Sequence, residues 1–180
     1  GDLDGVTYEE INYEGYGPGG VALLVETQTD NKNRTAAEVR HVFTKYNGKL
    51  GSTGCVSYLF TRKGMIVVGG EKDDDAVDAE AVMEVAIEHG AEDVEESEGT
   101  VAVTTAFEDL HAVSTALQEA GFPVRSAELV MEPSTEVQIT DEKEAAGVLR
   151  LVNMLDDLDD VSRVSANFDI DDELMARLDS

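Results

Sequence analysis

Cysteine and tryptophan are nearly absent from this 180-residue chain, which has one cysteine, Cys55, and no tryptophan. A single cysteine cannot form an intramolecular disulfide, and zinc-binding spacings such as C-x-x-C do not occur. Cys55 lies in an apolar segment, which favours a packed thiol, and no spacing in the sequence nominates a histidine as its catalytic base. We therefore predict no metal site and no enzymatic activity.

Long apolar runs are also missing. No stretch of eighteen apolar residues occurs, so the sequence predicts no membrane-spanning helix and no membrane partner. No charged and then apolar leader opens the chain, and a cytoplasmic protein is expected. The sequence leaves open whether a removed N-terminal segment carried a targeting signal.

Basic residues are scarce, with 13 Lys and Arg against 39 Asp and Glu, a formal net charge of -26. Such a charge repels nucleic-acid phosphates. The distribution is uneven, because residues 31–70 hold seven bases and one acid, a net +6, which leaves -32 for the remainder. We call these seven bases the basic island: Lys32, Arg34, Arg40, Lys45, Lys49, Arg62 and Lys63.

The basic island has two interpretations. Its cations either form a solvated surface that pairs with acids elsewhere, or they contact RNA or DNA phosphates in a salt-sensitive way. The acidic remainder is explained by solubility, by a halophilic or acid-biased source, or by docking of a basic partner. For the acidic string at residues 156–160, at the end of a predicted helix, only solvation remains as a role.

A glycine-rich loop at residues 15–20, GYGPGG, satisfies the letters of the dinucleotide-binding pattern G-x-G-x-x-G. That pattern needs a helix next, whereas residues 21–25 form an apolar run of strand character. Pro18 also lacks the N–H that would bind phosphate. The sequence therefore predicts a hairpin turn, with no cofactor and no small-molecule substrate.

A polar loop at residues 30–35 leads into a predicted helix. Asn33 or Thr35 is expected to cap it, Thr35 with Glu38 fits a capping box, and Gly48 fits the stop. The buried stripe is expected to contain Ala36, Val39, Phe43 and Tyr46. The outward face is expected to carry Arg34, Glu38, His41 and Lys45.

The rest of the chain alternates between strand and helix patterns. A strand at residues 55–60 ends at a break over residues 62–64. After it follow, in order, a strand at 65–68, a helix at 75–89, strands at 92–96 and 101–104, a helix at 108–120 and a strand at 124–131. This β-α-β-β-α-β order is typical of a ferredoxin-like unit.

The opening segment supplies only β-β-α-β, and it is completed by a strand at 136–139, a helix at 141–156 and a strand at 161–168. The predicted fold is therefore α+β, with two ferredoxin-like domains, the second inserted into the first. The expected domains are residues 1–63 with 133–170, the inserted residues 64–132, and a C-terminal tail at 171–180.

Five segments in one order resemble the motifs of the YebC family of gene-expression regulators: YEGYGPGG, TDNKNRTAAEVRHVF, GKLGSTGCVSYLF, GAEDV and MEPST. The resemblance covers almost the whole chain. Family members have a basic helical domain followed by two α/β domains, which implies that this chain is truncated. Three positions depart from the family pattern: Asn47 replaces a usual glycine, Cys55 a common serine and Glu136 a frequent basic residue.

The family includes a mitochondrial translational activator, and bacterial members are described as transcriptional regulators. The resemblance implies a non-enzymatic, ribosome-associated translation factor that assists proline-rich synthesis and binds RNA, with a DNA-binding transcriptional regulator as the alternative. The candidate nucleic-acid-binding residues are Lys32, Arg34, Arg40, His41, Lys45 and Lys49. The candidate loop residues are Tyr16, Gly17, Pro18, Gly19, Asn31, Asn33, Pro133, Ser134 and Thr135.

Overall fold

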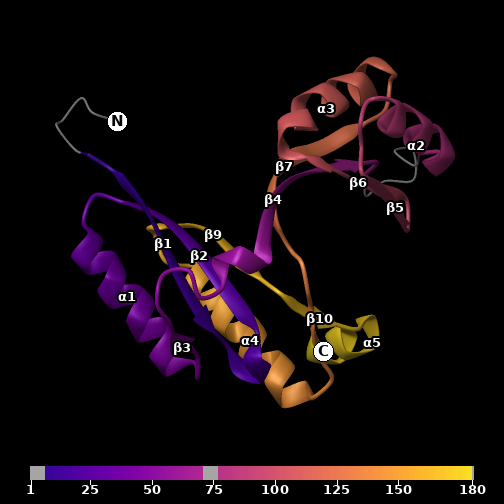
Figure 1. Cartoon of the computed structure of the whole chain (residues 1–180). Coiled ribbons are helices and arrows are strands. Elements are labelled where there is room, and N and C mark those ends of the chain that lie inside the picture. The colour runs from indigo at the N-terminus through magenta and orange to yellow at the C-terminus, as the bar shows by residue number, and fades with distance from the viewer. Residues whose placement is uncertain (1–6, 71–76, 180) are drawn as a thin grey trace. The chain divides into compact units, whose positions relative to one another are not determined.

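The chain divides into two compact units, each an α+β arrangement around a four-stranded antiparallel sheet (Figure 1). Unit 1 contains residues 1–60 and 133–180, and unit 2 contains residues 61–132. The computed structural model describes residues 7–70 and 77–179. The predicted fold class, two ferredoxin-like domains with the second inserted into the first, is confirmed.

Unit 1 is built around a sheet with strand order β3-β1-β2-β9. Its first part contains β1 (Glu9–Tyr16), a short 3-10 turn η1 (Pro18–Gly20), β2 (Ala22–Thr29), α1 (Lys32–Lys45) and β3 (Lys49–Leu50). Its second part contains β8 (Val137–Ile139), α4 (Glu142–Asp156), β9 (Val161–Ala166), β10 (Phe168–Ile170) and α5 (Asp172–Leu178). The predicted strand at 136–139 therefore exists, but it pairs with β10 outside the four-stranded sheet.

The predicted hairpin is formed by β1 and β2, which pair antiparallel from Glu9 opposite Thr29 to Tyr16 opposite Ala22. Side chains alternate between the two faces of this sheet. One face packs against α1 and α4, where a buried cluster includes Leu23, Phe43 and Leu151. The opposite face is covered by residues 51–59 at the buried Glu14, which is the register partner of Leu24.

Unit 2 follows the predicted β-α-β-β-α-β order, with strand order β5-β6-β4-β7. Its elements are β4 (Phe60–Val68), α2 (Ala79–Glu88), β5 (Asp93–Ser97), β6 (Thr100–Ala106), a short turn η4 (Phe107–Asp109), α3 (Leu110–Glu119) and β7 (Val124–Pro133). Both helices pack on the sheet through a core that includes Ile66, Val103 and Leu117. The helix start predicted at residue 75 lies outside the described residues, and Asp78 caps α2.

Two strand predictions are wrong. Of the strand predicted at 55–60, only Phe60 lies in a strand, as the first residue of β4. Residues 55–59 do not form a strand, because the Glu14 carboxylate accepts hydrogen bonds from backbone N–H groups that a sheet partner would otherwise use. They form a loop with a short 3-10 turn, η2 (Ser57–Leu59). The predicted break over residues 62–64 is also wrong, since β4 runs through it without interruption.

Both predicted ends of α1 are displaced. Asn31 caps the helix by accepting a hydrogen bond from the Arg34 N–H, so neither Asn33 nor Thr35 is the cap. At the other end Asn47, with φ of 63°, adopts the left-handed conformation that ends helices. Gly48 is required for a different reason: a Cβ there would lie 2.9 Å from side-chain atoms of Leu151 and Phe43.

The C-terminal segment is more ordered than the tail expected from the sequence. Asp171 caps α5, and Leu174 is buried in the core of unit 1. The sequence DELMARL is short, and contacts with distant elements such as α4 bury Leu174 and partly bury Met175 and Leu178.

Candidate nucleic-acid interface

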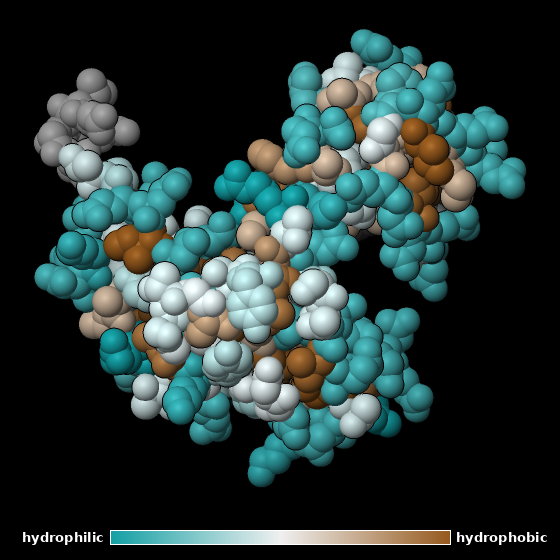
Figure 2. All heavy atoms as spheres, viewed as in Figure 1, coloured by the Kyte–Doolittle hydropathy of each residue, from teal (hydrophilic) through white to brown (hydrophobic). Residues whose placement is uncertain are grey.

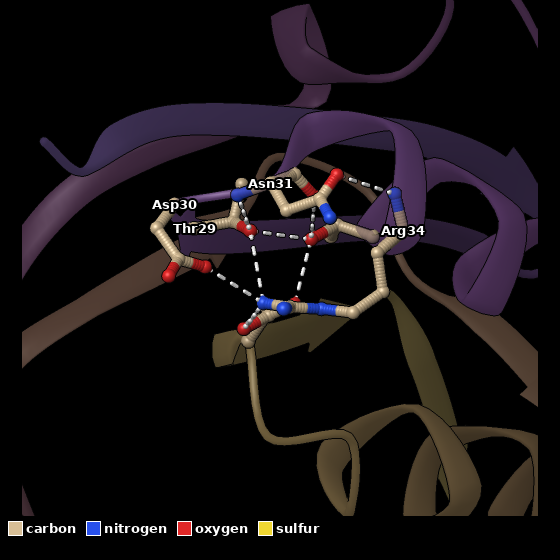
Figure 3. Close-up of polar contacts among 6 residues, drawn as sticks. Thr29, Asp30, Asn31 and Arg34 are labelled. Atoms are coloured by element: carbon tan, nitrogen blue, oxygen red, sulfur yellow. Dashed lines mark hydrogen bonds and ion pairs between the residues drawn. The ribbon is translucent and has the colours of Figure 1, made fainter. Parts of the chain in front are cut away.

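The N-terminal end of α1 holds a cluster of polar contacts around Arg34 (Figure 3). The Arg34 guanidinium forms three hydrogen bonds with Asp160: Nη2 lies 3.0 Å from each carboxylate oxygen, and Nε lies 3.2 Å from Oδ2. The same Nη2 lies 2.9 Å from Asp30 Oδ1. The buried Thr35 hydroxyl donates to Asp160 over 2.7 Å, and the Thr29 hydroxyl lies 2.7 Å from Thr35. Arg34 therefore joins the start of α1 to the segment before β9.

The pKa shifts at this end of α1 favour the charged forms of Asp160 and Arg34, which attract each other. The Thr35 hydrogen bond and the Arg34 guanidinium lower the pKa of the Asp160 carboxyl, and the two carboxylates raise the pKa of Arg34. The interpretation of residues 156–160 as merely solvated is thus wrong for Asp160. A shallow pocket of about 370 Å³ lies here, and four carboxylates against one guanidinium make it repel phosphate. It is lined by Tyr8, Asp30, Arg34, Glu38, Asp159 and Asp160.

The C-terminal end of α1 has the opposite character. Arg40, His41, Lys45 and Lys49 are exposed, and in the described part of the chain none of them forms an ion pair. Arg150 of α4 adds a further cation. The ring of Tyr46 has the Lys45 ammonium 5.6 Å and the Arg150 guanidinium carbon 5.5 Å from its centroid. We call Arg40, His41, Lys45, Lys49 and Arg150 the cationic end of α1.

The predicted basic island is divided by the fold. Arg62 and Lys63 belong to unit 2, where Arg62 lies over the Phe107 ring and the Lys63 ammonium is 2.6 Å from Glu92. Lys32 begins α1 and is exposed. Arg40 and His41 are adjacent in the sequence, so their positions differ by about 100° around the axis of α1 and they lie on different parts of its surface. Sequence reasoning missed Arg150, because nothing in the α4 pattern indicates that its side chain reaches Tyr46.

The glycine-rich loop is packed against α4 and β8. Gly17 donates a backbone hydrogen bond to Val21 over 2.8 Å, and Gly19 has φ of 75°. A Cβ atom at Gly19 would lie 2.5 Å from Oε1 of Glu144 in α4. A Cβ atom at Gly147, also in α4, would lie 3.4 Å from Cγ of Pro18. The predicted loop candidates Gly17, Pro18 and Gly19 therefore have a packing role, and a strand follows them, as expected of a hairpin.

The end of β1 beside this loop carries Tyr16, which is directly opposite Lys49 in the pairing of β1 with β3. The Tyr16 hydroxyl donates to the Cys55 carbonyl over 3.3 Å. Partial burial raises the pKa of Tyr16, and the neighbouring Cys55, Tyr58 and Glu14 add to the shift. Tyr16 thus lies between a lysine and the segment that contains Tyr58.

Hydrogen bonds to the carboxylate of Glu14 hold that segment, residues 51–59, in place, and Glu14 is only 3% exposed. One carboxylate oxygen accepts from Gly54 N–H over 2.7 Å, and the other from the N–H groups of Val56 and Ser57 over 3.0 and 2.6 Å. Burial raises the pKa of Glu14, but these hydrogen bonds outweigh it and the pKa is lowered. Sequence reasoning missed both Glu14 and Tyr58.

Residues Pro133–Thr135 lie beside the same segment. The Ser134 N–H donates to the Leu59 carbonyl over 2.7 Å, and the Thr135 carbonyl accepts from the Asn167 side chain over 3.3 Å. Asn167 in turn accepts from the Ala22 N–H over 2.7 Å. Among the loop candidates, Asn31 serves as the helix cap and Asn33 is exposed.

The described residues, 7–70 and 77–179, also bear on other functions. Within these ranges, no group of three or more His, Cys, Asp or Glu residues is arranged to hold a metal ion. None of the helices described there is long and apolar enough to cross a membrane.

Comparisons with known proteins agree with the fold. Residues 8–168 match the family described as the TACO1/YebC second and third domain. The chain is 49% identical over 180 residues to a protein of Acidithiobacillus ferrooxidans, and 52% identical over 178 residues to one of Geobacter sulfurreducens. Both are named probable transcriptional regulatory protein, and the chain covers 70% of each relative.

A crystal structure is also similar. The chain matches a conserved hypothetical protein of Aquifex aeolicus with a TM-score of 0.83 and 49% identity. The match covers 94% of this chain and 68% of that one.

Proposed function

Because the chain belongs to the TACO1/YebC family, we propose that it regulates gene expression as a non-enzymatic, RNA-binding factor that acts at the ribosome and assists synthesis of proline-rich stretches. The observation that supports RNA binding is the cationic end of α1. Its exposed cations have no carboxylate partner among the described residues, in a chain of net charge -26.

Local charge decides whether such a surface can bind phosphate. Arg34 and Lys45 are eleven residues apart on α1, which corresponds to roughly 16 Å along the helix axis. The Debye length at physiological ionic strength is about 8 Å, so the acidic pocket at one end is largely screened at the other. Phosphate binding at the cationic end is therefore compatible with the overall negative charge.

Co-sedimentation with purified ribosomes across a salt series tests this proposal. The binding variant is Arg40→Glu/Lys45→Glu/Lys49→Glu, which leaves the Arg34 ion pairs intact. We expect salt-sensitive binding of the unaltered chain and loss of binding in the variant, because each phosphate contact releases counterions. A chain that sediments equally well with these three reversals binds ribosomes elsewhere, and that result would contradict the proposal.

A matched pair of single substitutions controls for net charge. Lys45→Glu and Lys143→Glu both reverse one exposed lysine on a helix of unit 1, but only Lys45 belongs to the cationic end. We expect Lys45→Glu to weaken ribosome binding and Lys143→Glu to leave it nearly unchanged. Equal losses would mean that binding responds to overall charge rather than to this surface.

A DNA-binding transcriptional regulator is the second candidate, and it is favoured by the name that the relatives carry. The same cationic end would then contact duplex phosphates, and base contacts would give a sequence-dependent footprint. Duplex binding with such a footprint, in the absence of ribosome binding, would support this alternative over the translational role.

A further inference from the structure

Tyr58 is the most exposed large hydrophobic or aromatic side chain among the described residues, at 76%. It lies in η2, whose backbone is fixed beneath it by the hydrogen bonds from Val56 and Ser57 to Glu14. The backbone that carries this ring is thus fixed, while the ring itself is largely uncovered by neighbouring side chains. The fold uses a buried carboxylate to present this ring to solvent.

A second aromatic ring and a cation lie nearby. Tyr16 is 39% exposed, is tied by its hydroxyl to the Cys55 carbonyl, and lies in register with the exposed Lys49. Residues 51–54 between them are Gly, Ser, Thr and Gly, and all four are exposed. Small side chains of this kind allow the backbone of a ligand to approach closely.

This surface also lacks the acids that dominate the chain. Residues 39–70 contain no Asp or Glu, and the one carboxylate beneath the segment, Glu14, is enclosed by three backbone N–H groups. Figure 2 shows pale, near-neutral residues over the part of unit 1 where the segment after β3 lies, with both hydrophilic and hydrophobic residues around them. The described part of unit 1 thus presents an uncharged surface with exposed aromatic rings beside a lysine.

We propose that Tyr58 and Tyr16 form a stacking platform for unpaired bases of RNA, with Lys49 contacting an adjacent phosphate. This inference rests on the proposed RNA-binding function and names the part of the RNA that is bound. Aromatic side chains stack on bases of any sequence, and a neighbouring cation follows the backbone. Bases within a duplex are already stacked and are not available to such a platform.

The absence of tryptophan from the chain provides a direct test. In a Tyr58→Trp variant the only indole is placed at the platform, and the probes are a 12-nucleotide oligouridine strand and its duplex with oligoadenosine. We expect saturable quenching of the indole emission by the single strand at low salt, and much weaker quenching by the duplex. A Tyr8→Trp variant is the matched control, because Tyr8 is also exposed in unit 1 but lines the acidic pocket.

Binding of the single strand by substituted chains completes the test. Tyr58→Ala is expected to weaken it about tenfold and Tyr58→Phe to restore it, since stacking needs the ring and not the hydroxyl. Unchanged binding by Tyr58→Ala, with no quenching in Tyr58→Trp, would overturn the platform. If ribosome binding is still lost on reversing the cationic end, only this inference fails, whereas a chain that binds neither ribosomes nor the single strand refutes the proposed function as well.

Discussion

The two ends of α1 carry the same kinds of basic side chain and use them in different ways. At the N-terminal end Arg34 is held between Asp160 and Asp30, while at the C-terminal end Lys45 lies over Tyr46 with no carboxylate partner among the described residues. The helix itself does not cause this difference. The segment before β9 brings a carboxylate to one end, and α4 brings Arg150 to the other. What packs against a helix therefore decides whether its cations stabilise the fold or remain available to a ligand.

The largest effect on this comparison is expected from Asp160→Ala. The substitution removes the carboxylate that accepts a hydrogen bond from the buried Thr35 hydroxyl and forms three hydrogen bonds with Arg34, so we expect the free energy of unfolding of unit 1 to fall by about 3 kcal/mol. Urea denaturation measures this loss. The exposed neighbour Asp159 is the control, and an equal loss in Asp159→Ala would show that the contacts to Asp160 are not what matters.

The contribution of Asp160 should also depend on pH. Its pKa is lowered in the folded chain from the usual 3.8, so its charged form contributes stability above that value, and the contribution is lost as the pH falls through the folded pKa. The stability difference between the unaltered chain and Asp160→Asn should thus be constant above about pH 5 and shrink below pH 3.8. Urea denaturation at several pH values measures it, and a difference that grows on acidification would contradict the assignment.

A smaller effect comes from neutralising one cation at each end. Arg34→Gln should lower the melting temperature, but less than Asp160→Ala does, because Asp160 keeps its hydrogen bond from Thr35. Lys45→Gln should leave the melting temperature nearly unchanged and weaken RNA binding instead. Calorimetry measures the melting temperatures of the two variants, and co-sedimentation measures their binding to ribosomes. Equal melting temperatures would contradict the view that only the cation at the N-terminal end stabilises the fold.

The smallest effect concerns the backbone at the cationic end. Asn47 has a positive φ, so Asn47→Ala should destabilise the chain by about 1 kcal/mol and Asn47→Gly should be neutral or slightly stabilising. Ribosome binding should be retained in both folded variants, since neither alters a charge. If Asn47→Gly instead abolished binding at full stability, the geometry after α1 would matter to the interface beyond its charges.

Local patterns were sufficient to predict much of the fold. The β-α-β-β-α-β order of unit 2, the hairpin of β1 and β2, and burial of Val39 and Phe43 all follow from apolar periodicity. The errors arose where a distant side chain competes with a local preference. Glu14 accepts hydrogen bonds from the backbone of an apolar run about 40 residues later, which forms a loop instead of a strand. The Thr35 hydroxyl, whose position suggested a helix cap, donates to the distant Asp160 instead.

The candidate site was less predictable for the same reason. In the sequence of residues 31–70, Arg34, Lys45 and Lys63 differ little, since each is simply a positive charge. In the fold, the residues that surround each of them come from different parts of the chain. Asp160 lies 126 residues from Arg34, and Lys63 belongs to another unit altogether. Lys45 and its neighbours at the C-terminal end of α1 are exposed, as the prediction assumed, and in the described part of the chain they form no ion pair.

The hydrogen bond between the Ser134 N–H and the Leu59 carbonyl has a consequence for the history of such chains. It holds together, inside unit 1, the two points at which the chain leaves for unit 2 and returns from it. A segment whose entry and exit are already joined can be lengthened, exchanged or removed by recombination without changing the host's own connections. Unit 2 is in this sense an exchangeable insertion, because any insert whose two ends lie equally close together is compatible with the fold of unit 1.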